Sequence, residues 1–161
     1  MIRVATTNDA EAIASIYNHY VVNTTITFEE QEVTATQMAG RIAEVQSASL
    51  PWLVAEQSGE VLAYAYATKW KARSAYRFSV ESTVYVKNGF ARQGLGTKLY
   101  EGLVLNLKER GVHAVMGGIA LPNESSIALH EKFGFKKVAH FQEVGFKFCR
   151  WLDVGYWQRV L

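Results

Sequence analysis

The stretch from Ser79 to Tyr100, SVESTVYVKNGFARQGLGTKLY, limits the possible folds more than any other part of this chain. Its first half is dominated by β-branched and aromatic residues that alternate with others, which is typical of a strand. Asn88-Gly89 is a turn signal, and Gly94-Leu95-Gly96 opens a series of leucines at four-residue steps, which predicts a helix. The sequence therefore predicts a strand, a glycine-bearing loop and a helix in direct succession.

This succession is suited to binding an anionic group. The first N–H groups of a helix have no intrahelical acceptor, and the helix dipole adds partial positive charge there. Glycines let a pyrophosphate approach those N–H groups, and Arg92 adds a cation to the loop. A dinucleotide-binding fold is excluded because its third glycine and its acidic residue are missing, and a Walker loop is excluded because no Gly-Lys-Ser/Thr follows.

Length and composition narrow the class of protein. The 161 residues, 49% hydrophobic and 20% charged, fit one domain over residues 1–161 with a full core. A net charge of +2 argues against nucleic acid and membrane surfaces as partners, and no apolar run is long enough to span a bilayer. We see no signal peptide, and the single Cys149 excludes an intramolecular disulfide, so we expect a cytoplasmic protein. No spacing of His, Cys, Asp and Glu predicts a metal site.

The rest of the chain predicts strands mixed with helices. Asn8 and Thr34 precede Glu11 and Gln37 by three residues, the spacing of a capping box at the start of a helix. A third helix follows the glycine loop, and a fourth covers residues 124–132. Strands are predicted at residues 2–5, 52–56, 60–70, 76–86, 114–120, 135–141 and 154–161. This order predicts an α/β (α+β) fold with a mixed, mostly antiparallel central sheet flanked by helices.

Two sequence patterns follow one another in the second half of this chain. Residues 91–96 are ARQGLG, and residues 123–135 are NESSIALHEKFGF. They resemble the Q/R-x-x-G-x-G/A loop and the N-x-x-[SA]-x(3)-Y-x-K-x-G-F run of the GCN5-related N-acetyltransferases. Ala91 stands where that family usually has Gln or Arg, and His130 where it usually has Tyr. The resemblance covers essentially the whole chain and implies the single-domain acyl-CoA N-acyltransferase fold.

Four further segments are WKARSAY at 70–76, ESTVYV at 81–86, GFK at 145–147 and WLDVGYWQ at 151–158. They are similar to the phosphinothricin N-acetyltransferases and the methionine sulfoximine/sulfone acetyltransferases, and the phosphinothricin group also has a His at the position of His130. This resemblance implies acetyl-CoA as co-substrate, the α-amine of a small glutamate-like amino acid or analogue as acceptor, and a homodimer. Trp151, Tyr156 and Trp157 fit a subunit interface or a core.

The resemblance also implies how coenzyme A is held. Its pyrophosphate is expected on the N–H groups of the glycine loop, and its pantetheine arm beside the preceding strand. A backbone N–H of that strand would polarise the thioester carbonyl, and Asn123 would hold the arm by its side-chain amide. The expected cofactor-binding residues are Val84, Tyr85, Val86, Arg92, Gln93, Gly94, Leu95, Gly96, Thr97 and Asn123.

Glu81 and His130 are the candidate catalytic residues. An α-amine is mostly protonated below about pH 7.7 and must lose a proton before it attacks a thioester. A carboxylate with a raised pKa can take that proton directly or through one water, so Glu81 is the expected base, although strand glutamates more often face solvent. For His130 two interpretations stay open: proton handling near the sulfur or as a second base, and a favourable interaction with the helix C-terminus.

The candidate substrate-binding residues are Phe28, Lys71, Arg73, Tyr76 and Thr83. Lys71 and Arg73 are either a solvated loop pair or the partners of the two anionic groups of a small acidic amino acid. Phe28 either forms a wall of the same pocket or belongs to the core.

Two other functions stay open. A protein or peptide N-terminal acetyltransferase would need an open groove in place of a small pocket. A non-catalytic CoA-binding module would tolerate Glu81→Gln without any change in phenotype.

Overall fold

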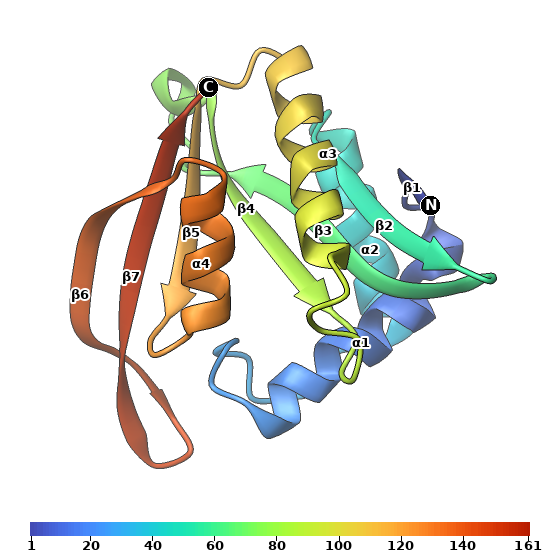
Figure 1. Ribbon diagram of the computed structural model, residues 1–161, viewed down its shortest axis with the longest axis horizontal. Helices are drawn as coiled ribbons and strands as arrows, with labels where there is room; N and C mark the ends of the chain where they lie inside the picture. The colour runs from blue at the N-terminus through green and yellow to red at the C-terminus, as the bar shows by residue number, and fades with distance from the viewer.

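The computed structural model describes all 161 residues and consists of one seven-stranded sheet with helices on both faces (Figure 1). The strands are β1 (Ile2–Val4), β2 (Trp52–Gln57), β3 (Glu60–Lys69), β4 (Ser79–Val86), β5 (Ala114–Ala120), β6 (Lys136–Lys147) and β7 (Arg150–Val160). The helices are α1 (Ala10–Asn23), α2 (Ala35–Ser47), α3 (Leu95–Glu109) and α4 (Glu124–Lys132). The sheet order is β1-β2-β3-β4-β5-β7-β6, and only β4 and β5 are parallel. The predicted fold class and element order are confirmed.

The hairpin of β6 and β7 is longer than the predicted strands at 135–141 and 154–161. Its ladder continues to the pair Lys147 and Arg150 at the tip. The register shifts between Phe141 and Gly145, and Glu143 has a φ of 52°. Such a bulge interrupts the period-two alternation by which a strand is detected in a sequence, which explains why the outer half was missed.

Two element starts also differ from the sequence prediction. The first capping box is formed by Thr6 and Asp9 around a 3₁₀ turn at Thr7–Asp9, and α1 begins only at Ala10, so the cap is not Asn8. β4 starts at Ser79 because Ser74–Tyr76 forms another 3₁₀ turn. The Thr34 capping box is confirmed: its hydroxyl accepts from the Gln37 N–H at 3.1 Å.

Alternating side chains of the sheet form two separate cores. In β3, Ala63, Ala65 and Ala67 face α3, whereas Tyr64 faces α1 and α2. Small residues on one face let α3 lie close to the sheet, and its Leu99, Leu103 and Leu107 are completely buried there. In Figure 1, α3 and α4 lie in front of the sheet, and α1 and α2 lie behind it.

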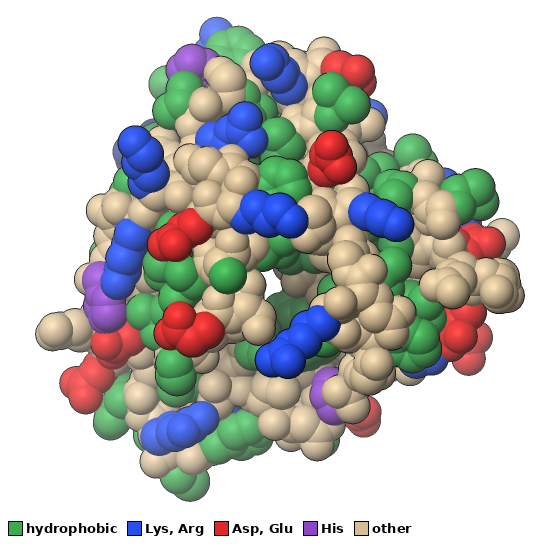
Figure 2. Space-filling model, viewed as in Figure 1, with side chains coloured by type: hydrophobic (Ala, Val, Ile, Leu, Met, Phe, Trp, Pro, Cys, Tyr) green, Lys and Arg blue, Asp and Glu red, His purple; other side chains and the backbone are tan.

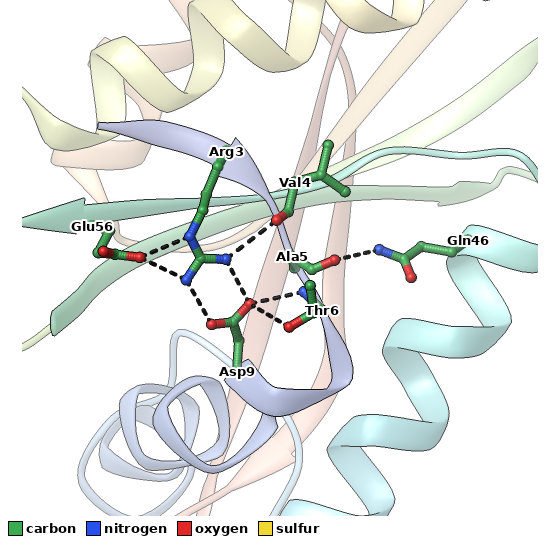
Figure 3. Close-up of polar contacts among 7 residues, drawn as sticks. All are labelled: Arg3, Val4, Ala5, Thr6, Asp9, Gln46 and Glu56. Carbon is green, nitrogen blue, oxygen red and sulfur yellow. Dashed lines mark hydrogen bonds and ion pairs between the residues drawn. The ribbon is translucent and has the colours of Figure 1, made fainter. Parts of the chain in front are cut away.

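A polar network fixes the N-terminal strand to both neighbouring elements (Figure 3). The two terminal guanidinium nitrogens of Arg3 donate to the two oxygens of Asp9 at 2.8 Å, and Nε donates to Glu56 at 2.7 Å. Asp9 is nearly buried, and the Arg3 guanidinium holds the pKa of its carboxyl below the usual range. Gln46 of α2 adds a hydrogen bond to the Ala5 carbonyl at 2.7 Å.

The sheet opens between its two parallel strands. Only three pairs join them, Ser79 with Ala114, Val80 with Val115 and Glu81 with Met116, although β4 continues to Val86 and β5 to Ala120. Figure 1 shows the two arrows separating toward their carboxyl ends. The backbone of the outer half of β4 is therefore not paired with β5, in the middle of the molecule.

None of the helices combines the length and the hydrophobicity that a membrane span requires.

Candidate active site

The opening between β4 and β5 forms a cleft on the side of α3 and α4, which we name the α4-side cleft. Its volume is about 250 Å³. Figure 2 shows the molecule hollowed at this position, with an opening near its centre. The lining residues come from β4, the glycine loop and the start of α3, from β5, α4 and its cap, and from the end of α1 and the segment after it. They are Tyr20, Ile26, Ser82, Thr83, Val84, Tyr85, Val86, Ala91, Gly96, Gly118, Ile119, Ala120, Asn123, Ser125, Ser126, Leu129 and His130.

The backbone of β4 presents polar groups to this cleft. The Lys87 N–H donates to the Leu62 carbonyl of β3 at 2.7 Å, so odd-numbered residues here direct their peptide groups toward β3. The peptide groups of Val84 and Val86 therefore point the other way, into the opening. The Tyr20 hydroxyl donates to the Val86 carbonyl, in agreement with this direction. The Val86 carbonyl is thus occupied, and an extended ligand can pair with the other peptide groups of this strand edge.

The glycine loop extends the cleft toward the start of α3. Arg92 and Gly94 have φ values of 65° and 77°, and backbone with left-handed residues of this kind is common in loops whose N–H groups bind anions. The first intrahelical bond of α3 runs from Lys98 to Gly94, so the N–H groups of residues 95–97 have no helical acceptor. A second cavity along this loop shares Val86 and Gly96 with the α4-side cleft and also includes Arg92, Gly94, Leu95 and Thr97.

The loop is accessible, as a ligand site requires. Arg92, Gln93 and Gly94 are exposed, and residues 95–97 are half-buried. Gln93 lines neither cavity. Asn123 caps α4, because its Oδ1 accepts from the Ser126 N–H at 3.2 Å, and its amide nitrogen is left for another partner.

Glu81 lies in a second cleft on the opposite face of the sheet, which we name the hairpin-side cleft. Its volume is about 480 Å³, and most of its lining is apolar. The lining residues are Ile26, Thr27, Phe28, Glu81, Tyr85, Gly118, Ala120, Phe141, Val144, Val154 and Tyr156. Burial raises the pKa of the Glu81 carboxyl, against the opposing effects of the Lys71 ammonium and the Tyr156 hydroxyl.

Two consecutive glycines of β5 make room for one candidate catalytic residue on each face. A Cβ on Gly118 would lie 2.8 Å from Oε1 of Glu81, and a Cβ on Gly117 would lie 2.4 Å from Nε2 of His130. Neighbouring residues of a strand face opposite sides of the sheet. Glu81 and His130 therefore lie on opposite faces, and the two clefts share only Ile26, Tyr85, Gly118 and Ala120.

His130 is a buried side chain in the last turn of α4. Its Nδ1 donates to the Ser126 carbonyl at 2.7 Å, and its ring packs edge-on against Tyr100 and Phe135. Burial lowers the pKa of the imidazole. For His130, a favourable charge interaction with the end of α4 requires the imidazolium form, which burial disfavours. Its position beside the α4-side cleft leaves the proton-handling hypothesis in place.

The predicted substrate-binding residues fall into two groups. Phe28 lines the hairpin-side cleft with Glu81, and Thr83 lines the α4-side cleft. Lys71 is exposed with its ammonium 5.1 Å from the centre of the Trp70 ring, yet close enough to influence Glu81. Arg73 and Tyr76 are exposed on the 3₁₀ turn and line neither cleft.

Sequence reasoning missed three features of the site. Tyr156 lies beside Glu81, although it was expected at a subunit interface or in the core. Of the two tryptophans grouped with it, Trp157 belongs to the core and Trp151 is 63% exposed. Tyr20 bonds to the free edge of β4 from α1. The paired glycines 117 and 118, inside an otherwise apolar strand, were the available signal for a close approach to the backbone. No group of three or more His, Cys, Asp and Glu side chains is arranged to hold a metal ion.

Comparison with known proteins agrees with this geometry. Residues 2–155 match the family model described as Acetyltransferase (GNAT) domain. The chain is 41% identical over 158 residues to the phosphinothricin N-acetyltransferase of Streptomyces viridochromogenes, with 98% of this chain and 86% of the relative covered. It is 36% identical over 160 residues to the L-methionine sulfoximine/L-methionine sulfone acetyltransferase of Salmonella typhimurium, covering 99% and 94% of the two chains.

Two solved structures are similar over the whole chain. A GNAT superfamily phosphinothricin acetyltransferase from Sinorhizobium meliloti in complex with AcCoA has a TM-score of 0.97 and 34% identity, covering 100% of this chain and 88% of that one. A ribosomal-protein-alanine N-acetyltransferase from Brucella melitensis has a TM-score of 0.97 and 35% identity, covering 100% and 99%. The open parallel strand pair, the glycine loop at the start of α3 and the full-length match lead to one conclusion: this chain belongs to the GNAT family of acetyltransferases.

Proposed function

We propose that this protein transfers the acetyl group of acetyl-CoA to the α-amine of a small glutamate-like amino acid or analogue. Phosphinothricin, methionine sulfoximine and methionine sulfone are the acceptor candidates, because relatives at 36–41% identity are named for them. The single observation that supports the proposal best is the juxtaposition of two clefts that meet at an unpaired strand edge, one with a half-buried carboxylate and one with free backbone N–H groups.

Coenzyme A fits the α4-side cleft and the glycine loop. The N–H groups of residues 92–97 bind its pyrophosphate, and Arg92 adds positive charge. The pantetheine arm pairs with the free edge of β4 at Val84 and Val86, and one of these N–H groups polarises the thioester carbonyl. The amide nitrogen of Asn123 contacts the arm from the opposite side of the cleft.

The acceptor amine enters from the hairpin-side cleft and reacts in a ternary complex. Glu81, whose pKa is raised by burial, takes a proton from the ammonium form directly or through one water. The neutral amine attacks the thioester carbonyl, the new N–C bond forms, and the C–S bond breaks. The proton that the nitrogen still has to lose passes to the departing thiolate, so coenzyme A leaves as the thiol. His130 lines the α4-side cleft on the coenzyme side and is absent from the lining of the hairpin-side cleft, so we assign the base to Glu81 rather than to His130.

A thiol-release assay with acetyl-CoA tests this function. The panel contains free amino acids, the three acceptor analogues and short peptides, each with wild-type protein and Glu81→Gln. We expect release with the small acceptors and at least a hundredfold loss in the variant. Binding of coenzyme A without release from any amine would instead support a non-catalytic module.

Acetylation of a protein N-terminus is the second candidate, because one similar structure is named as a ribosomal-protein-alanine N-acetyltransferase. The hairpin-side cleft argues against it, since Phe28 and Val144 wall it at about 480 Å³, a volume suited to one small molecule. Release from peptides beginning with alanine, without release from the free analogues, would replace the first proposal with this one.

We also infer a homodimer from the apolar surface of the β6–β7 hairpin. Phe146 and Trp151 pack against each other with ring centres 4.8 Å apart, and both are more than half exposed, as is Phe148 at the tip. Exposed apolar clusters of this kind mark interaction sites. Light scattering should give twice the chain mass, and Phe146→Glu combined with Trp151→Glu should give the monomer; a monomeric wild type would refute the inference.

A further inference from the structure

The β6–β7 hairpin contacts the segment between α1 and α2, residues 24–34, at two adjacent points. Gly145 lies against the ring of Phe28, and Lys147 bonds to the backbone of Thr27. In Figure 1 this segment, drawn in blue after α1, lies beside the lower part of the hairpin. The residues belong to GFK, one of the segments that carry the family resemblance, and the proposed chemistry gives them no role.

Gly145 allows an unusually close approach of the Phe28 ring. A Cβ at this position would lie 2.4 Å from Cε2 and 2.5 Å from Cζ of the ring, closer than nonbonded carbon atoms tolerate. The glycine itself is buried beneath the ring. A side chain at residue 145 would therefore displace Phe28, which is 38% exposed at the mouth of the hairpin-side cleft and can move outward.

Lys147 is a buried cation on the same strand face. The side chain is 1% exposed, and its ammonium donates to the Thr27 carbonyl at 2.8 Å. The Thr27 hydroxyl in turn shares a hydrogen bond of 2.8 Å with the Tyr17 hydroxyl of α1. Burying an ammonium is unfavourable unless its hydrogen-bond partners are held in place, so this contact fixes the backbone at residue 27.

The two contacts meet at the wall of the acceptor site. Thr27 and Phe28 line the hairpin-side cleft together with Glu81. We propose that Gly145 and Lys147 are positioning residues that hold the Phe28 ring beside Glu81, so that the hairpin determines which amines the cleft accepts. This inference rests on the proposed acetyl transfer, and neither residue touches the reacting atoms. It predicts a change in KM for the acceptor and no change in KM for acetyl-CoA, whose proposed site is on the other face of the sheet.

The first test is Lys147→Met, which keeps the apolar stem and removes the ammonium. We expect KM for the acceptor to rise about tenfold, because small misplacements of a binding wall weaken productive binding, while KM for acetyl-CoA stays within twofold. Lys136→Met is the matched control, since Lys136 is exposed on the same strand and should leave both constants unchanged. An unchanged acceptor KM, or an equal rise in both constants, overturns the proposal.

The second test is a double-mutant cycle between Gly145 and Phe28, which stays informative if Lys147→Met fails to fold. Gly145→Ala alone and Phe28→Ala alone should each raise acceptor KM. In the Phe28→Ala background Gly145→Ala should add nothing, because the ring that it displaces is gone. Equal increases in both backgrounds would show that Gly145 acts elsewhere. Gly40→Ala, whose Cβ meets nothing within 4 Å, is the control.

The wild-type assay distinguishes failure of the proposed function from failure of the positioning role. If the wild-type protein releases no thiol with any free amino acid or analogue, the proposed function fails. If the wild type is active and the variants show no selective change in acceptor KM, the positioning role alone fails.

Discussion

The α4-side cleft and the hairpin-side cleft share an opening in the sheet but are built in different ways. The α4-side cleft presents mainly backbone groups, the free edge of β4 and the N–H groups at the start of α3. The hairpin-side cleft is lined by residues from five separate parts of the chain, among them Phe28, Glu81 and Tyr156.

This difference matches the two kinds of ligand that we propose. Backbone N–H groups recognise a phosphate or a thioester carbonyl without the help of a particular side chain, so they suit a co-substrate shared by a whole family. Side chains on separate elements can change one by one, so they suit an acceptor that differs between relatives. The sheet between the clefts should make the two sites respond separately to mutation.

The largest expected effect is on the hairpin side. Glu81→Gln should lower kcat/KM for the acceptor by about 10²–10⁴-fold, because it removes the proposed base but keeps the shape of the side chain. Binding of coenzyme A, measured by calorimetry, should be unchanged. A parallel loss of coenzyme affinity would show that the two clefts are not independent.

A smaller effect is expected on the α4 side. Gly94→Ala places a Cβ on a residue with a φ of 77° and should raise KM for acetyl-CoA about tenfold, through a strain of about 1 kcal/mol that reshapes the loop. Gly59→Ala is the matched control, since Gly59 has a φ of 80° in the distant β2–β3 turn and no atom near its Cβ position. Both variants should lose similar stability, and only the first should change KM.

The pH dependence should also distinguish the two clefts. Acceptor turnover should fall as pH drops through the raised pKa of Glu81, because the protonated carboxyl cannot accept a proton. Coenzyme binding, for which we propose backbone N–H groups, should not follow this titration. If the loss of turnover at low pH persists unchanged in Glu81→Gln, a group other than Glu81 causes it.

Thermal stability should also depend on the ionisation of the Glu81 carboxyl. Its folded pKa is raised above the ordinary value of 4.5, so its contribution is fully present below pH 4.5 and is lost as pH rises through the folded pKa. Glu81→Gln, which stays neutral, should therefore have a higher Tm than the wild type at pH 7, and the difference should vanish below pH 4.5. Equal Tm values at pH 7 would show that the carboxylate is not destabilised by burial.

The smallest kinetic effect is expected from a change outside both clefts. Arg3→Ala breaks the contacts to Asp9 and Glu56 and should cost about 1–3 kcal/mol of unfolding free energy in chemical denaturation, with both KM values unchanged. Asp9 has a lowered pKa, so its contribution is present above its ordinary value of 3.8 and is lost as pH falls through the folded pKa. A change in either KM would mean that the N-terminal strand is coupled to the site.

The sequence predicted the α4-side cleft better than the hairpin-side cleft, because the two clefts are built differently. The strand, glycine loop and helix at residues 79–109 are adjacent in sequence, and local signals were sufficient to place them. Glu81 was identified on its strand, but Tyr156 beside it and the glycines behind it were not. The outer half of the hairpin was missed because a bulge at Glu143 hides its periodicity.

The sequence by itself determined the order of the elements, the family and the position of the loop that opens α3, because each depends on residues close together in the chain. Only the tertiary structure decided which face of the sheet Glu81 and His130 occupy, and that Thr27 meets Lys147 from the other end of the chain. These contacts join residues up to 120 positions apart. Their partners are chosen by sheet order and register, which no local pattern encodes.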